Sequence, residues 1–381
     1  MHIDDLEVLK YIQKTLGIGT VYIKPNIAEF VVKRFHEVET IIEIFSKTPL
    51  NSCKHLNFLN FKQAFELYTS KDIKDKNELR VQIEDLRNKM NTNRVDYSWP
   101  DRKFHITPNW LLGFIEGDGS FGIEFSRTRN SHTKLGFKLQ IIQSVVDLDL
   151  LLAIKNYINS LSVSLLNTFD QTVTIDLKDQ VLEEGLQRNY VGLYSSTNKK
   201  IVKPNEKYNL TVRDFDFIKD TLLPFFDNLT FHTKKELDYQ DWKNIILLKE
   251  KGFHYTTEGL DLIELTLKQM NSRRLSTNVN GTLPDRELLL SKINELLSRP
   301  SNFESVDGKI YIKSLGKYYY NNTKSVSISL LDENNLVLKT WPSLTSCAEG
   351  LGISKSGVQK RLKNQTRFLF NGEIVHLKRS E

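Results

Sequence analysis

The feature that most constrains the fold is the short, largely apolar stretch Trp110–Phe121, in which Gly113 and Gly117 stand four residues apart. Thr107 can cap a helix here, and Pro108 suits its first position, where the missing backbone N–H does no harm. The predicted helix is apolar on nearly every side, so it should be buried, yet it is too short to cross a bilayer. Gly113 and Gly117 fall on one face, and each costs about 1 kcal/mol relative to alanine. We therefore expect these glycines to let a second helix backbone approach closely.

Two carboxylates, Glu116 and Asp118, close this predicted helix. They lie at its C-terminal end, where the helix macrodipole is already negative, so they do not stabilise it. A carboxylate in a locally unfavourable position is more easily explained as a metal ligand. We therefore predict that Asp118 binds a cation and that Glu116 has a supporting role. The alternative is a buried helix that ends in an ordinary Asp-Gly turn.

Composition and charge narrow the class of protein. The chain has 381 residues, of which 39% are hydrophobic and 26% charged, as in a soluble globular protein of two or three domains. The net charge is +6, and residues 311–381 hold eleven Lys/Arg against five Asp/Glu. A basic terminal module suggests a polyanionic partner, and a solvated basic surface is the alternative.

Several kinds of site are disfavoured. Cys53 and Cys347 stand far apart without a CxxC partner, which argues against a zinc site and a disulfide framework. The histidines show no HExxH spacing. The sequence has no apolar run of about 18 residues, no signal peptide and no Arg-rich transit segment, so we expect no membrane contact. A protein of this kind that works in an organelle would be made there.

Two parts of the chain show the same order of predicted elements, which indicates an internal duplication. Asp5–Ile12 aligns with Asp147–Ile154, and both begin an amphipathic helix. The second copy carries an insertion over 179–207. The first copy lacks whatever precedes the helix at Asp147. The remaining aligned pairs are Phe30–Phe35 with Leu210–Phe215, Lys54 with Lys234 and, after a one-residue slip, Asn60-Phe61-Lys62 with Asp241-Trp242-Lys243.

The second copy mixes helices with antiparallel strands. Apolar residues alternate with polar or small ones from Phe121 to Ser126, a period of two that marks a strand with one buried face. We expect Glu124, Ser126 and Arg127 on its open face. The predicted elements are a helix over 108–118, strands over 120–128 and 135–144, a helix over 148–160, strands near 162–169, 171–177 and 208–213, and helices from Phe215 and Thr233.

Leu111–Gly119 resembles the LAGLIDADG motif of homing endonucleases and intron maturases, with substitutions at Leu112, Phe114, Glu116 and Gly117. In that family the motif helix packs against its twin from a second repeat. The resemblance implies an α+β saddle built from αββαββα repeats, the first of them truncated at its N-terminus. Only one motif is present, which implies nicking of DNA, or cleavage of both strands only by a homodimer.

The resemblance also assigns roles to individual residues. It implies that Asp118, with the Gly117 carbonyl as a weaker ligand, binds Mg²⁺ or another divalent cation such as Mn²⁺ at the scissile phosphate. Lys234 is expected near the cleaved phosphate, with Lys54 as its counterpart in the first copy. Gln143 is expected to position water.

Contacts to double-stranded DNA are expected from the strands and from the C-terminal tail. On the first hairpin they are Arg127, Arg129, Lys134 and Lys138. In the tail, two strands precede a predicted helix-turn-helix, which resembles the NUMOD-type modules appended to homing nucleases. A small helical cap with basic surface residues is the alternative. The exposed residues of its second helix are expected to be Lys355, Gln359, Lys360, Arg361 and Lys363.

The predicted domains are an incomplete first repeat with a linker helix over 1–98, the motif-bearing repeat over 99–270, a linker over 271–310 and the helix-turn-helix module over 311–381. The preferred hypothesis is a group I intron-encoded homing endonuclease of fungal mitochondria. One alternative is a maturase that binds its own group I intron RNA without cutting DNA. Another is an incompletely delimited reading frame whose missing residues lie upstream.

Overall fold

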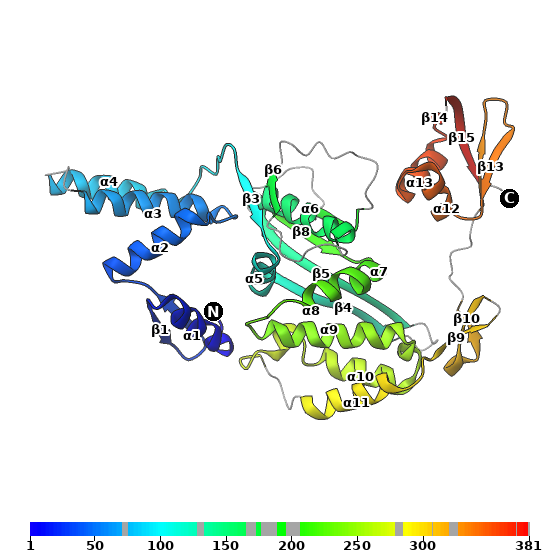
Figure 1. Cartoon of the computed structure of the whole chain (residues 1–381), viewed down its shortest axis with the longest axis horizontal. Helices are drawn as coiled ribbons and strands as arrows, with labels where there is room; N and C mark the ends of the chain where they lie inside the picture. Colours follow the sequence, from blue (N-terminus) through cyan, green and yellow to red (C-terminus); the bar gives the residue numbers. More distant parts are fainter. Residues whose placement is uncertain are drawn as a thin grey trace. The chain divides into compact units, whose positions relative to one another are not determined.

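The computed structural model describes residues 1–70, 75–127, 133–164, 173–176, 189–195, 206–278, 285–306, 308–319, 327–370 and 372–379. They divide into two compact units (Figure 1). The larger unit comprises Met1–Leu177 and Tyr190–Asn302, and most of the smaller one is Phe303–Glu381. No helix in these ranges is both long and apolar enough to span a bilayer.

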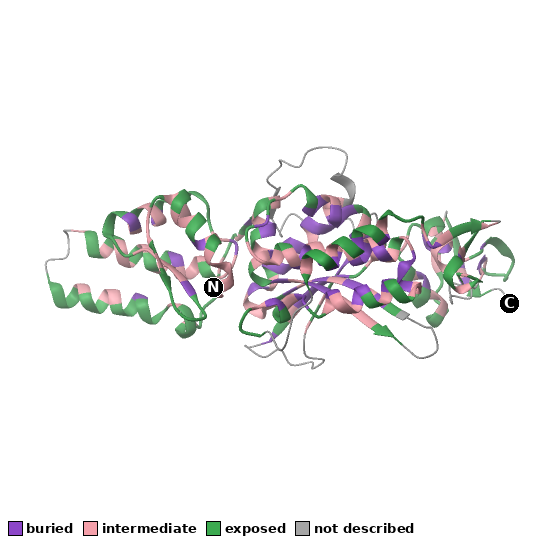
Figure 2. Cartoon of the chain, turned by 90° about the horizontal axis from the view of Figure 1, so that it is seen from below, coloured by how far each residue is buried: buried purple, intermediate pink, exposed green. Residues whose placement is uncertain are grey.

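A four-stranded antiparallel sheet organises the larger unit, in the order β4-β5-β8-β7. Its strands are β4 (Gly119–Arg127), β5 (Thr133–Ser144), β7 (Val191–Ser195) and β8 (Lys207–Val212). Phe121, Leu139 and Ile141 are fully buried on the face that carries the helices. Figure 2 shows buried residues gathered along these strands and the helices against them. The predicted α+β fold is confirmed, whereas β7 was missed because it lies inside the presumed insertion.

The helices of the second copy lie where the sequence predicted them. The motif helix is α5 (Pro108–Asp118), and the last long helix, α9 (Lys235–Glu250), packs on β4. Part of the strand predicted near 162–169 belongs instead to helix α6, and the rest falls outside the described residues. The other elements are β3 (Lys103–Ile106), α6 (Leu148–Ser164), β6 (Val173–Asp176), α7 (Phe215–Phe217), a π-helical turn (Ile218–Leu222), α8 (Leu223–Asp227), α10 (Thr257–Leu267) and α11 (Arg286–Ser298).

The stretch interpreted as a linker over 271–310 joins the larger unit up to Asn302. Leu289, Ile293 and Leu296 of α11 are buried in the same core as the sheet. The sequence before α11 is short and polar, and the residue that attaches it to α9 is charged. For this reason the packing was not predicted. That residue, Arg274, is buried and contacts two aspartates of α9.

The first copy repeats the order of elements seen after β5. A 3₁₀ turn (Ile3–Asp5) leads into α1 (Leu6–Leu16), and the same kind of turn (Val145–Asp147) leads into α6. The predicted order is therefore confirmed. The elements that follow are β1 (Thr20–Ile23), β2 (Ala28–Val31), α2 (Phe35–Lys47), α3 (Lys54–Thr69) and the linker helix α4 (Lys76–Asn88).

The alignment of the two last helices needs a correction of one residue. Helix α3 begins at Lys54 and α9 begins at Lys235, and both are 16 residues long. The slip predicted near Asn60 therefore occurs before Lys54. The counterpart of Lys54 is Lys235, and the counterpart of Cys53 is Lys234.

Each copy caps the last helix of the other copy. The backbone N–H of Cys53, which precedes α3, donates to Asp147 Oδ1 at 2.7 Å. The backbone N–H of Lys234, which precedes α9, donates to Asp5 Oδ1 at 2.8 Å. Since Asp5 and Asp147 occupy equivalent places ahead of α1 and α6, the two caps are exchanged between the copies.

The smaller unit contains two sheets and a pair of helices. Helix α12 (Leu344–Leu351) ends at Gly352, which has a φ of 65°, and α13 (Lys355–Asn364) follows after a tight turn. This confirms the predicted helix pair. The strands are β9 (Phe303–Val306), β10 (Lys309–Ile312) and β11 (Lys317–Tyr318) in one sheet, and β12 (Ile328–Leu331), β13 (Val337–Trp341), β14 (Phe368–Phe370) and β15 (Glu373–Arg379) in the other.

A buried histidine predicts how stability depends on pH. His254 is buried against Tyr255, with ring centroids 4.0 Å apart. Burial lowers its pKa to about 4, whereas an exposed histidine titrates near 6.5. As the pH falls, the unfolded chain therefore binds a proton at His254 before the folded chain does. We expect its contribution to the free energy of unfolding to be complete above pH 6.5 and to fall by about 2 kcal/mol between pH 7 and pH 5. Urea unfolding of the wild type and His254→Gln would measure it, and equal pH slopes would contradict it.

Candidate active site

Asp118 lies at the open end of the motif helix. The Thr107 side chain caps α5 by accepting from the Trp110 N–H at 3.0 Å, and Leu111 and Ile115 bury one side of the helix. The chain then turns directly into β4 at Gly119. A Cβ at Gly119 would lie 2.7 Å from the Ile115 side chain and 2.8 Å from its carbonyl oxygen, so only glycine fits there. This tight turn leaves the Asp118 side chain exposed at the junction of helix and sheet.

Gln143 contacts Asp118. Gln143 Nε2 donates to Asp118 Oδ2 at 2.8 Å. The register of the sheet brings them together, because Gly119 pairs with Ile141 across β4 and β5. The hydrogen bond fixes one oxygen of the carboxylate.

Glu116 orders the loop before α9. Its Oε1 accepts from the backbone N–H groups of His232 and Thr233 at 2.8 and 2.7 Å, and from Thr233 Oγ1 at 2.8 Å. These contacts fit the supporting role predicted for Glu116. They also tie the end of the motif helix to the start of α9, where two lysines follow each other.

Of these two lysines, Lys234 forms an ion pair with the first copy. Its ammonium lies 3.1 Å from Asp4 Oδ2. Burial alone would raise the pKa of Asp4, but hydrogen bonds from Ser276 and Lys234 lower it to about 2. Asp4 therefore remains charged and holds Lys234 in an ion pair.

Lys235 is the lysine at the motif, and sequence reasoning missed it. Its ammonium donates to the Gly119 carbonyl, next to Asp118. Burial lowers the pKa of Lys235, against opposing effects of Asp238 and Asp118. The start of α9 would have identified this lysine, because Lys235 is the first residue of the helix. Its counterpart Lys54 begins α3, and no contact within the described ranges brings Lys54 to Asp118.

The glycine face of α5 is open. Gly113 and Gly117 are exposed, and a Cβ built on either would have no described atom within 4 Å. The expected close approach of a second helix is therefore not made by any part of the chain that the structure describes. The assignment of the Gly117 carbonyl as a ligand remains a prediction.

The sheet face away from the helices is polar. Arg213 pairs with Glu124 at 2.6 Å, and Gln140 donates to Asn209 at 3.1 Å. The hydrogen bond from Arg213 lowers the pKa of Glu124, although burial alone would raise it. Lys134 and Lys138 belong to β5 on this same face, since each pairs with a β4 residue of the open side, Ser126 and Gly122.

Arg127 was expected on this polar face, and that expectation is wrong. Alternation along β4 turns it to the helix side, where it lies 3.2 Å from Asp261 and 3.4 Å from Glu264 of α10. The hydrogen bonds that Arg127 donates to these carboxylates raise its pKa. Arg129 lies outside the described residues.

Helix α13 carries the predicted basic residues of the tail. Lys355, Gln359, Lys360 and Lys363 are exposed. Arg361 differs, because its guanidinium packs over the Phe368 ring at 4.9 Å. The exposed surface of α13 is thus basic without Arg361.

The residues around Asp118 suit a divalent cation that also binds its substrate. Among the described residues no three His, Cys, Asp or Glu side chains form a cluster that could enclose a metal. Asp118 therefore offers a single carboxylate. Mg²⁺ is commonly held by one or two carboxylates together with phosphate oxygens and water, so this donor set fits.

Comparisons with known proteins agree with this geometry. A family model described as LAGLIDADG endonuclease matches residues 1–65, 111–183 and 168–246. An uncharacterized mitochondrial protein RF1 of Saccharomyces cerevisiae is 26% identical, over 97% of this chain and 73% of that protein. A probable intron-encoded endonuclease 3 of Neurospora crassa is 26% identical, over 70% of this chain and 46% of its own length.

Solved structures share the fold. The LAGLIDADG homing endonuclease I-SmaMI bound to cleaved DNA has a TM-score of 0.56 and 22% identity, over 72% of this chain and 85% of that one. I-GzeII in complex with its DNA target has a TM-score of 0.55 and 20% identity, over 72% of this chain and 87% of that one. Since the family model matches more than half of the residues, this chain belongs to the LAGLIDADG endonuclease family.

Proposed function

We propose that this chain hydrolyses phosphodiester bonds in double-stranded DNA at a long recognition site, as an intron-encoded homing endonuclease of fungal mitochondria. One observation carries the proposal: Asp118 is exposed at the end of the motif helix, accepts a hydrogen bond from Gln143 and lies next to the half-buried Lys235. The relatives support it, since they are fungal and are named as mitochondrial or as intron-encoded endonucleases.

The side chains divide the chemistry among them. A divalent cation held by Asp118 and phosphate oxygens would neutralise charge at the phosphate and favour attack by water. Gln143 orients the Asp118 carboxylate, and its amide can also hydrogen-bond water. Lys235 supplies a fixed positive charge at the same helix end, which favours the charge that develops on the leaving oxygen.

Binding would use the polar face of the sheet and the exposed side of α13. Lys134 and Lys138 contribute positive charge on the sheet, whereas the charge of Arg213 is balanced by Glu124. Contacts of lysine and arginine with phosphates give affinity that falls with salt, whereas Gln140 can reach base edges. Arg127 is already held by two carboxylates and is not part of this surface.

The proposed activity is tested on a supercoiled plasmid that carries the uninterrupted exon junction. With Mg²⁺ we expect nicked circles, because one motif supplies one carboxylate; linear product should require a homodimer. EDTA should abolish both products. An intact plasmid at saturating protein would refute the proposal.

The second candidate is an RNA maturase, because RNA binding needs no second motif. It predicts tight binding of the group I intron RNA without any cutting of the plasmid. A filter-binding assay with the intron RNA and an equal length of unrelated RNA separates the two functions.

The two adjacent lysines give a matched pair of variants. We expect Lys235→Met to slow plasmid cleavage about 100-fold, since it removes a preorganised charge beside Asp118. Lys234→Met should change the rate less than about threefold, because this side chain is exposed and paired with Asp4. Single-turnover rates at saturating protein measure both. A larger loss for Lys234→Met would return the catalytic assignment to Lys234.

A further inference from the structure

The segment that follows α10 contacts the start of β4 through one side chain, that of Asn271. This residue begins a 3₁₀ turn, Asn271–Arg274. Its Nδ2 donates to the Phe121 carbonyl at 3.2 Å, and its Oδ1 accepts from the Ser120 hydroxyl at 3.3 Å. Both partners follow Gly119 directly, and β4 is an edge strand of its sheet. Asn271 therefore holds the first residues of this edge.

The backbone of Asn271 contacts α9 at the same time. Its N–H donates to Oδ1 of the buried Asp238 at 2.8 Å. Arg274 Nε donates to the same oxygen at 3.0 Å, so both ends of the 3₁₀ turn are attached to this carboxylate. Asn271 thus bridges two elements, with its main chain on the helix and its side chain on the strand.

Lys235 makes the same bridge one turn earlier on α9. Its ammonium donates to the Gly119 carbonyl, one residue ahead of Ser120. Residues three apart on a helix lie on one face, so Lys235 and Asp238 are neighbours. Burial lowers the pKa of Lys235, and the charge that opposes burial most strongly is that of Asp238. The two bridges run side by side and together fix the separation between α9 and the start of β4.

The backbone at Asn271 allows its side chain to be removed alone. Its φ is 56°, in the left-handed region that asparagine and glycine adopt at lower cost than other residues. Asn271→Gly should therefore keep the turn and the backbone bond to Asp238. It removes only the two side-chain bonds to β4.

We propose that Asn271 is a positioning residue for Lys235: it holds the start of β4 against α9 and thereby keeps the Lys235 ammonium on the Gly119 carbonyl. That carbonyl adjoins Asp118, so the charge stays beside the carboxylate. The effect on cleavage rests on the proposed nuclease activity, whereas the placement of the ammonium is measured without DNA. The proposal gives a role in the site to a segment outside the residues that the family model matches.

The first test is a double-mutant cycle of Asn271→Gly and Lys235→Met. We expect Asn271→Gly to slow single-turnover cleavage about tenfold in the wild-type background but less than about twofold in the Lys235→Met background, because the amide acts through the lysine. DNA binding in EDTA should be unchanged. Equal factors in the two backgrounds would overturn the proposal, because a general loss of structure would slow both.

The second test follows the ammonium itself in the absence of DNA. Proton–nitrogen NMR detects a lysine ammonium whose exchange with water is slowed by burial and a hydrogen bond, and Lys235→Met identifies the signal by its loss. We expect the exchange of this signal to be at least about tenfold faster in Asn271→Gly. A signal that is absent from the wild type, or unchanged in Asn271→Gly, would overturn the proposal. Faster exchange in a chain that leaves the plasmid intact would refute the proposed nuclease activity alone.

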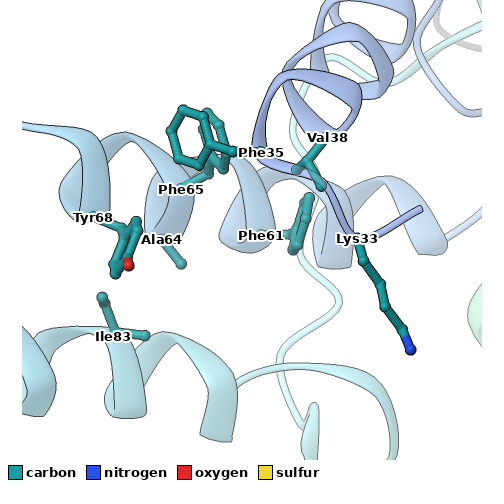
Figure 3. Close-up of a pocket in the computed structure, with 8 residues that line it drawn as sticks. All are labelled: Lys33, Phe35, Val38, Phe61, Ala64, Phe65, Tyr68 and Ile83. Carbon is teal, nitrogen blue, oxygen red and sulfur yellow. The ribbon is translucent and has the colours of Figure 1, made fainter. Parts of the chain in front are cut away.

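Two further variants control for the substitution and for general loosening. Asn91→Gly also removes an asparagine side chain at a positive φ, 53°, and this residue is exposed in the same unit. Phe61→Leu loosens an apolar cavity of about 460 Å³, whose eight lining residues all belong to the first copy (Figure 3). Both variants should cleave at the wild-type rate and keep the Lys235 signal. A tenfold loss in either would overturn the assignment to Asn271.

Discussion

Asp118→Asn is expected to reduce DNA cleavage by about three orders of magnitude, with binding to the same DNA preserved. Asparagine is nearly isosteric and can still hydrogen-bond to Gln143, so the local structure should persist. What it loses is the negative charge, and no cluster of carboxylates in the described part of the chain can replace it. Single-turnover cleavage of a supercoiled plasmid in Mg²⁺ measures the rate.

The matched control is Asp261→Asn, an exposed aspartate on α10 that pairs with Arg127 on the helix side. It should cleave at the wild-type rate. A cleavage rate of Asp118→Asn within tenfold of the wild-type rate would show that the Asp118 carboxylate is not needed for catalysis. The fold would remain, because Asp118 is not part of the core.

Arg274→Met is expected to lower the free energy of unfolding by about 3 kcal/mol. Arg274 is buried and contacts Asp238 at 3.0 Å and also Asp241, so its removal leaves buried negative charge. The loss stays near the lower end of the usual range because Arg286 still lies 2.7 Å from Asp241. Urea unfolding at pH 7.5 measures it.

The pH dependence of this loss checks its cause. Burial raises the pKa of Asp241 above 3.8, partly opposed by Arg286 and Arg274. Without Arg274 this pKa should rise further, so the loss should be complete at neutral pH and shrink as acid protonates Asp241.

Arg299→Met serves as the control for Arg274→Met. Its ion pairs with Glu258 and Glu295 are exposed to solvent, so their loss should change the free energy of unfolding much less. Equal losses for the two substitutions would contradict the role of burial.

Local sequence patterns predicted most of the fold and part of the site. The capped start at Thr107, the alternation along β4 and the repeated order of elements each follow from neighbouring residues, and all are present. The family resemblance assigned Gln143 to the site, and the register of β4 and β5 explains its hydrogen bond to Asp118.

The errors arose where tertiary contacts decide. The first turn of α9 determines which of two adjacent lysines faces Asp118, and a shift of one residue rotates a side chain by about 100°. The error at Arg127 has the same cause, because in a strand a shift of one residue moves a side chain to the opposite face of the sheet. The packing of Arg274 could not be read from a polar stretch, because its partners lie on a helix distant in sequence.

The exchanged caps on α3 and α9 have a consequence for how the larger unit comes apart. Melting of either copy withdraws an aspartate from the helix of the other, at Cys53 or at Lys234. Neither half then keeps its stability alone, so the two should denature in one cooperative transition. In a duplicated ancestor, the same exchange of capping aspartates would have made the two copies fold as one unit.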